Sequence, residues 1–202
     1  MMGSPKNTDS VHIMQLIQPN TVGAEIGVWE GSSSIQMARK GLKKLHLVDP
    51  YSIRGYVPAS EAKDPTFNWE GYFKKYSKLT GGKSEKHFEK YYDEVYARVV
   101  KKFSKFDFVE IHRKTSTEWF DSFDGEKLDW IYIDGDHSYT GVLDDLNNCL
   151  KVMKPGAFIL GDDYKWGRPG DKGGVKKAVN QFIDERNLKI KKYGSNQFRI
   201  NL

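Results

Sequence analysis

The stretch EIGVWEGSS, residues 25–33, sets the fold of this 202-residue chain. It continues an apolar run that starts at Val22, and a helical pattern over residues 33–40 follows at once. Gly27 and Gly31 allow the backbone to turn tightly and to approach a ligand closely. The first turn of the helix presents free N–H groups, which suit a carboxylate or a phosphate. The stretch therefore predicts a strand–loop–helix unit that holds the anionic group of a ligand, with a glycine turn needed only for packing as the alternative.

Two residues near this loop restrict the kind of ligand. A dinucleotide site has a second glycine where this loop has Trp29, and that bulk keeps a pyrophosphate away. Asp49 lies 22 positions after Gly27, at the end of the next predicted strand, where an acid accepts hydrogen bonds from ribose hydroxyls. The alternative for Asp49 is a simple turn before Pro50. The pair favours an adenosine-containing ligand other than NAD.

Strand and helix patterns alternate along the rest of the chain. This alternation predicts a parallel sheet with right-handed crossovers. Residues 188–193 and 197–201 flank a Gly-Ser-Asn turn and predict an antiparallel hairpin. We therefore expect a single α/β domain over residues 1–202, a Rossmann-like doubly wound sheet of seven strands that is mostly parallel with a C-terminal antiparallel hairpin. The predicted central strands are Val22–Val28, Leu45–Val48, Phe108–Ile111, Trp130–Ile133 and Phe158–Leu160, and the predicted helices include Ser33–Lys40, Glu85–Phe103, Tyr139–Met153 and Val175–Arg186.

Residues 50–107 form a long insertion between the second and third predicted strands. It is rich in lysine and in aromatic side chains, and long ordered connections often act as lids or binding loops. Its rings suit stacking on a sugar or a base, but they equally suit packing of added helices onto the sheet, and both interpretations stay open. The aromatic residues in question are Tyr51, Tyr56, Phe67, Trp69, Tyr72, Phe73, Tyr76, Phe88, Tyr91, Tyr92 and Tyr96.

Acidic residues follow the fourth and fifth predicted strands. Asp134 comes after the fourth strand, and Asp162 and Asp163 come after the fifth. The carboxyl ends of neighbouring parallel strands meet at one edge of the sheet, so these carboxylates are expected to lie close together. Their repulsion favours a bound cation, and oxygen ligands suit Mg²⁺ rather than Zn²⁺. Hydrogen bonding of the acids to loop amides or to a cofactor amine is the alternative.

His137 lies three residues beyond Asp134, just past the strand end. An imidazole there can act as a base near pH 7 and take a proton from a metal-bound hydroxyl. We therefore predict Asp134 and His137 as catalytic residues, with a structural histidine as the alternative. The loop at residues 163–170 either forms part of the acceptor pocket, through Tyr164, Trp166 and Arg168, or is an exposed connection.

Composition restricts the class of protein. The net charge of +5 comes largely from scattered lysines, which favour solubility over nucleic acid as a partner. No apolar run approaches the roughly 20 residues that span a bilayer, so a cytoplasmic protein without membrane contact is expected. The single cysteine, Cys149, lies in a helical pattern and is expected to be buried.

Together these segments, with Met37-Ala38-Arg39 after the glycine loop, resemble the metal-dependent class I S-adenosylmethionine O-methyltransferases. This group includes the catechol, caffeoyl-coenzyme A and macrolide-sugar enzymes. The resemblance implies that Asp134, Asp162 and Asp163 hold the metal, the last being Asn in catechol enzymes. His137 stands where those enzymes have a catalytic Lys and sugar-modifying relatives have a His. The cofactor-binding residues that the resemblance implies, with Trp29 where a Tyr is usual, are Glu25, Gly27, Trp29, Gly31, Ser32, Ser33, Asp49, Thr115 and Ser116.

The resemblance implies metal-assisted methylation, with Mg²⁺, of a hydroxyl on a small molecule or sugar. One alternative is methylation of a nucleic-acid or protein nitrogen, although the Asn- or Asp-Pro-Pro-Tyr-like motif that holds a flipped base is missing after the fourth strand. Another is a non-catalytic module that binds an adenosine ligand and regulates a partner. The sequence leaves the acceptor, the metal requirement and a homo-oligomeric state open.

Overall fold

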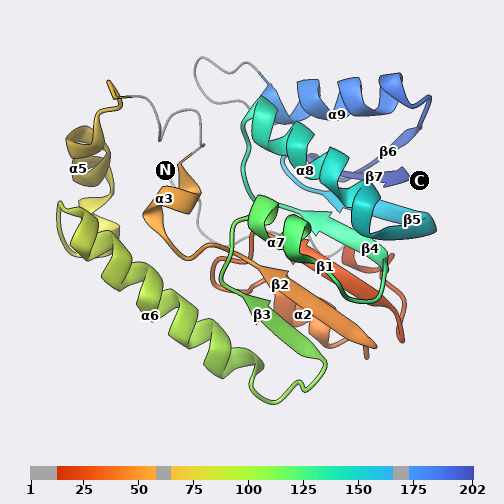
Figure 1. Cartoon of the computed structure of the whole chain (residues 1–202), viewed down its shortest axis with the longest axis horizontal. Helices are drawn as coiled ribbons and strands as arrows, with labels where there is room; N and C mark the ends of the chain where they lie inside the picture. Colours follow the sequence, from red (N-terminus) through yellow and green to blue (C-terminus); the bar gives the residue numbers. More distant parts are fainter. Residues whose placement is uncertain (1–12, 58–64, 166–172) are drawn as a thin grey trace.

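The computed structural model of the chain describes residues 13–57, 65–165 and 173–202 (Figure 1). Seven strands form one sheet in the order β3-β2-β1-β4-β5-β7-β6. Strands β3, β2, β1, β4 and β5 run parallel, and β7 pairs antiparallel with both β5 and β6. The predicted mostly parallel sheet with a C-terminal antiparallel hairpin is therefore confirmed. The strands are β1 (Val22–Ile26), β2 (Lys44–Val48), β3 (Val109–His112), β4 (Leu128–Ile133), β5 (Met153–Gly161), β6 (Ile190–Tyr193) and β7 (Gln197–Asn201).

Helices cover both faces of the sheet (Figure 1). Helices α7, α8 and α9 pack on the face that carries Val22, Ala24 and Ile26 of β1. Helices α2 and α6 pack on the opposite face, against Leu45 and Leu47 of β2. The described helices are α2 (Ser34–Ala38), α3 (Ile53–Tyr56), α5 (Trp69–Thr80), α6 (Glu85–Phe103), α7 (Ser116–Ser122), α8 (Tyr139–Val152) and α9 (Gly174–Glu185).

Strands β1 and β4 lie at the centre of the sheet and are buried on both faces. Trp130 and Ile131 of β4 point to opposite faces, and each is fully buried. A Cβ at Gly23 would lie 2.1 Å from the Trp130 ring, so β1 needs glycine where the indole crosses it. This two-sided burial explains why the strands read as continuous apolar runs in the sequence.

Several predicted boundaries differ from the observed ones for local reasons. Strand β1 ends at Ile26 instead of Val28, because Gly27 adopts φ 88°, a left-handed conformation that leaves the strand. The helix predicted over residues 33–40 is only Ser34–Ala38. Strand β5 is nine residues long and starts at Met153, well before the predicted Phe158.

The predicted insertion carries α3, α5 and α6. Phe88, Tyr92 and Val95 of α6 are buried at helical spacing against the sheet. Helix α5 packs on α6 through its rings, with the Phe73 and Phe88 centroids 5.1 Å apart. For these aromatic residues the packing interpretation is confirmed.

Two expectations from composition can be compared with the structure. Among the described residues no helix is both long and apolar enough to cross a membrane. Cys149 lies on α8 and is fully buried, as expected for a small apolar side chain.

Candidate active site

The glycine loop after β1 directly contacts the end of β4. The Asp134 amide donates to the Ile26 carbonyl at 2.8 Å. A Cβ on Gly27 would lie 2.3 Å from the Asp134 carbonyl oxygen. The sequence predicted that these segments meet in the crevice between β1 and β4, and the structure brings them together.

Asp49, at the end of β2, holds the loop in shape. Its Oδ2 accepts hydrogen bonds from the amides of Val28 at 3.0 Å and Trp29 at 2.8 Å, and its Oδ1 accepts from the amide of Tyr51 at 2.9 Å. These bonds stabilise Trp29 at φ 45°, a conformation that costs free energy for a non-glycine residue. Asp49 therefore orders the loop, and its predicted contact with ribose stays a prediction.

Glu25 and Ser34 form a buried pair beneath the loop. The Ser34 hydroxyl donates to Glu25 Oε2, and both residues are almost inaccessible to solvent. Burial raises the pKa of Glu25 well above its ordinary value, and the Ser34 bond partly offsets that rise. Sequence reasoning missed Ser34, although it is the last serine of the run at residues 32–34. The predicted Ser32 is exposed, and the half-buried Ser33 makes no capping bond with its side chain.

Three ionisable side chains come together where β4 and β5 end. His137 Nε2 lies 3.0 Å from Asp163 Oδ2 and 3.6 Å from Asp134 Oδ1. One ligand atom from each of these residues lies within 4.8 Å of the others. Asp163 adopts φ 56°, a left-handed conformation at the turn after β5. The sequence predicted this meeting of acids and His137 at the carboxyl edge of the sheet.

Asp162 belongs to the same edge but is engaged differently. Its Oδ2 accepts from the Tyr132 hydroxyl at 3.0 Å and from Gln197 Nε2 at 3.2 Å, and its Oδ1 accepts from the Asp163 amide at 2.7 Å. Sequence reasoning missed Tyr132 and Gln197. They lie on β4 and β7, the two strands that flank β5, and only the pairing of these strands brings their side chains to Asp162. These bonds use three of the four lone-pair directions of the carboxylate, and the fourth, on Oδ1, could face a metal.

The comparisons with known proteins agree with this geometry. Residues 24–164, more than half of the chain, match the methyltransferase domain family. The chain belongs to that family. The match runs from β1 through the glycine loop and the acids of β4 and β5.

The individual proteins that this chain resembles are distant in sequence. The uncharacterized protein R132 of Acanthamoeba polyphaga mimivirus is 26% identical over 178 residues, which is 87% of this chain and 64% of that protein. The chain thus spans less than two thirds of that relative's length. The O-methyltransferase from Bacillus cereus, in complex with SAH, superposes with a TM-score of 0.64 at 16% identity, covering 100% of this chain and 84% of the other. The N-methyltransferase NodS from Bradyrhizobium japonicum gives a TM-score of 0.59 at 13% identity, covering 96% and 92%. At these identities the likeness establishes the fold.

The two carboxylates beside His137 set the charge state of its imidazole. Burial lowers the pKa of its imidazole, but the hydrogen bonds and charges of Asp134 and Asp163 outweigh burial and raise this pKa to about 9. Burial and the neighbouring Asp162 raise the pKa of Asp134 to about 6, against the opposing effect of His137. At pH 7 the metal-free chain therefore holds an imidazolium, and the predicted role of His137 as a base beside a bound metal stays a prediction.

Gly31 and Thr115 have structural functions in addition to their predicted ones. Gly31 adopts φ 70°, and a Cβ there would lie 2.8 Å from Phe103 Cε2, so α6 excludes a larger residue. Thr115 is the N-cap of α7: its Oγ1 accepts from the Glu118 amide at 3.3 Å, and Glu118 Oε2 accepts from the Thr115 amide at 2.9 Å. Ser116 hydrogen-bonds the buried Asp145 of α8. The predicted adenine contact of Thr115 or Ser116 stays a prediction.

The loop after β5 is described only as far as residue 165. Tyr164 is buried, and its hydroxyl donates to Asn180 Oδ1 of α9 at 2.7 Å. This residue therefore packs α9 against the sheet. Trp166 and Arg168, the other acceptor-pocket candidates, lie outside the described residues.

Proposed function

We propose that this methyltransferase transfers the methyl group of S-adenosylmethionine to a hydroxyl of a small molecule or sugar, with assistance from a divalent cation. The observation that carries the proposal is the direct contact between the glycine loop at Gly27 and the backbone of Asp134. This contact puts a predicted cofactor loop beside the group formed by Asp134, His137 and Asp163. A cofactor on the loop would therefore have its reactive end near residues able to bind an acceptor and hold its proton.

S-adenosylmethionine is the donor that the loop fits. The crystallised O-methyltransferase of the same fold holds SAH, the product of that donor. In this chain we assign the methionine end to the turn at residues 31–33 and the ribose to Asp49. Trp29 is 42% exposed on the loop, where its ring can cover part of the cofactor. The wider binding set of the proposal is that of the sequence prediction: Glu25, Gly27, Trp29, Gly31, Ser32, Ser33, Asp49, Thr115 and Ser116.

Asp134 and Asp163 offer a donor set that fits a hard divalent cation such as Mg²⁺. Two carboxylates and one imidazole face each other, and the imidazolium now neutralises the acids. A bound cation would take over that neutralisation and lower the pKa of a coordinated hydroxyl. Asp162, through the Asp163 amide, positions the second acid. If Asp162 ligates the ion as well, its Oδ1 can do so through the lone pair that the Asp163 amide does not use.

The transfer itself needs few protein groups. The S–C bond of the donor breaks as the bond from the acceptor oxygen to the methyl carbon forms, leaving SAH and the hydroxyl proton. We assign that proton to His137 Nε2, which can accept it once a bound cation has replaced the imidazolium in neutralising the two carboxylates. Alignment of donor and acceptor supplies most of the remaining acceleration.

The first test is calorimetric titration of the full chain with S-adenosylmethionine and SAH, each with and without Mg²⁺, with NAD as the control ligand. Binding of the methyl cofactors and not of NAD is expected, and binding of NAD alone would overturn the proposal. Transfer of labelled methyl is then measured on panels of hydroxyl and amine acceptors, because the fold also serves an N-methyltransferase. Cofactor binding without turnover on either panel would instead favour a regulatory binding module.

A pair of variants tests the residues at the reacting end. Asp134→Asn should lower turnover by about 100-fold or more, because it removes a carboxylate from the charged group. Asp107→Asn, at an exposed position before β3, is the matched control and should leave turnover unchanged. Equal turnover in both variants would contradict the role of Asp134.

A further inference from the structure

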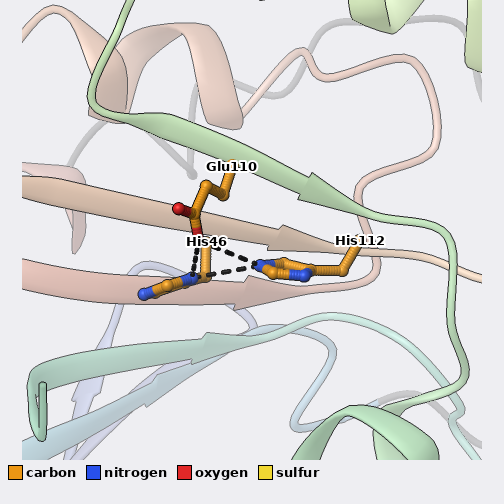
Figure 2. Close-up of side chains that lie close together, drawn as sticks. All are labelled: His46, Glu110 and His112. Carbon is orange, nitrogen blue, oxygen red and sulfur yellow. Dashed lines mark hydrogen bonds and ion pairs between the residues drawn. The ribbon is translucent and has the colours of Figure 1, made fainter. Parts of the chain in front are cut away.

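A second group of ligand-type side chains lies on the α7 side of the sheet. His46 of β2 and Glu110 and His112 of β3 point toward one another (Figure 2). His46 Nδ1 lies 3.1 Å from His112 Nε2 and 3.3 Å from Glu110 Oε2, and His112 Nε2 lies 3.8 Å from the same carboxylate oxygen. The group shares no residue with the one formed by Asp134, His137 and Asp163.

The three donor atoms have the spacing of ligands around one metal ion. Zn²⁺ binds imidazole nitrogen and carboxylate oxygen at about 2.0–2.2 Å, so tetrahedral ligands lie about 3.4 Å apart. The observed separations of 3.1, 3.3 and 3.8 Å bracket that value. A point about 2 Å from all three atoms therefore exists without movement of the backbone.

The chemistry of the donors selects the class of ion. Two imidazoles and one carboxylate suit Zn²⁺ and its transition-metal neighbours better than Mg²⁺ or Ca²⁺. Only one hydrogen fits between two nitrogens 3.1 Å apart, so at least one of them presents a lone pair. Lys44 donates to Glu110 Oε1 and leaves Oε2 facing the imidazoles.

The imidazole rings are held in place by α7 and the residue that follows it. The His46 ring meets the Phe123 ring edge-on, with their centroids 5.4 Å apart. The centroid of the Trp119 ring lies 5.9 Å from that of His46 and 6.0 Å from that of His112. Ligands fixed by such packing bind an ion with little loss of side-chain entropy. His46 is only 5% exposed, whereas Glu110 is exposed and leaves a route for an ion to enter.

The open side of the group faces a cavity of about 500 Å³. His46, Glu110 and His112 all line this cavity. Three protein ligands with an open fourth position are typical of sites that keep an exchangeable water or ligand. The charged residues of the wall balance, since three of them are lysines and three are acids: Lys43, Lys44, Lys114, Glu110, Asp124 and Glu126.

We infer that His46 Nδ1, His112 Nε2 and Glu110 Oε2 form a binding site for one divalent transition-metal ion of the Zn²⁺ class, with its fourth position open to the cavity. The ion would link the edge strand β3 to β2, and it would stabilise the folded chain because the unfolded chain lacks the site. This inference does not depend on the proposed methyl transfer. The competing explanation is that the three side chains only hydrogen-bond one another.

The test uses the full chain after removal of metals with a chelator. Zn²⁺ affinity is measured by competition with a chromophoric chelator, and Co²⁺ is added separately to record the visible absorption of a four-coordinate ion. Glu110→Gln and His112→Gln each remove one ligand with little change of volume. Loss of a residue that merely supports a ligand costs about 10–100-fold in affinity, so each variant should weaken Zn²⁺ binding by about 100-fold or more.

Two controls separate this site from other metal binding. His87→Gln removes an exposed histidine on α6, and Asp134→Asn disables the group at the strand ends. Both controls should keep the Zn²⁺ affinity, the Co²⁺ absorption and the rise in melting temperature on adding Zn²⁺. The inference is overturned if the wild-type chain binds neither ion, or if Glu110→Gln and His112→Gln both bind Zn²⁺ as tightly as the wild type. It is equally overturned if binding is lost only in Asp134→Asn.

Discussion

The part of the chain that the structure describes contains two groups of histidine and carboxylate whose imidazoles differ in charge state. At the strand ends one imidazole lies between two carboxylates, and the pKa of His137 rises to about 9. Beside α7 two imidazoles share one carboxylate that Lys44 also contacts, and burial together with His112 lowers the pKa of His46 to about 4. The same residue types thus yield a cation in one place and a neutral ring in the other. The ratio of acids to bases around each ring, combined with burial, sets its charge.

Titration of the imidazoles in the metal-free chain tests the comparison directly and has the largest expected effect. NMR in the presence of a chelator should give a midpoint of about 9 for His137 and about 4 for His46. Signals are assigned with His137→Gln and His46→Gln. Midpoints near the ordinary 6.5 for both rings would show that neither environment acts as described.

Replacement of Gly27 should destabilise the folded chain at the contact between the glycine loop and Asp134. Gly27→Ala puts a methyl group against the Asp134 carbonyl oxygen in a left-handed conformation, so the unfolding free energy should fall by about 4 kcal/mol or more. Gly41→Ala is the matched control, with φ 70° and no atom within 4 Å, and should cost only about 1–2 kcal/mol. Urea unfolding measures both. Equal losses would mean that backbone strain, and not the contact with Asp134, makes Gly27 necessary.

Asp145 is buried on α8, bonded to Ser116 of α7, and it gives a pH-dependent prediction. Burial raises its carboxyl pKa from 3.8 to about 7, against the hydrogen bond from Ser116. Between these values the folded chain holds a proton that the unfolded chain has lost, so its contribution to stability falls as the pH rises and levels off above about pH 7. Asp145→Asn should therefore raise the unfolding free energy at pH 8 by on the order of 3 kcal/mol relative to wild type.

The gain from Asp145→Asn should shrink to below about 1 kcal/mol near pH 4, where wild-type Asp145 is protonated in the folded chain and partly protonated in the unfolded chain. Asp144→Asn, at the exposed neighbouring position, should show no such pH-dependent gain. Urea unfolding at both pH values measures the difference. A gain of the same size at pH 4 and pH 8 would exclude titration of Asp145 as its source.

The smallest effect is expected at Thr115, which begins the helix that packs on His46. Thr115→Ala removes a side-chain cap and should cost about 1 kcal/mol, whereas Thr115→Ser keeps the hydroxyl and should cost less. Urea unfolding and cofactor titration are run on both variants. Unchanged stability together with weaker cofactor binding in Thr115→Ala would assign this hydroxyl to the adenine pocket instead of the helix cap.

The local pattern of residues was sufficient for the fold and for the meeting of the glycine loop with the acids at the strand ends. Gly27 and Gly31 mark the loop, and Asp134 and Asp162 follow apolar runs whose parallel pairing brings them to one edge. These features can be predicted because a buried strand needs a run of apolar residues and a left-handed turn favours glycine, and both are local properties of the sequence. The family match over residues 24–164 covers the same segments.

Contacts between distant residues were settled only when the chain packed in three dimensions. Ser34 beneath Glu25, and Tyr132 and Gln197 around Asp162, leave no signal in the sequence because each bond joins separate elements. The group of His46, Glu110 and His112 depends on the register of β2 against β3, across a separation of 66 residues between His46 and His112. The charge of His137 depends likewise on burial and on two carboxylates from different strands. The sequence determines which residue types are present. Their pKa values and the geometry of a ligand set depend on the distances between side-chain atoms, and only tertiary packing determines those distances.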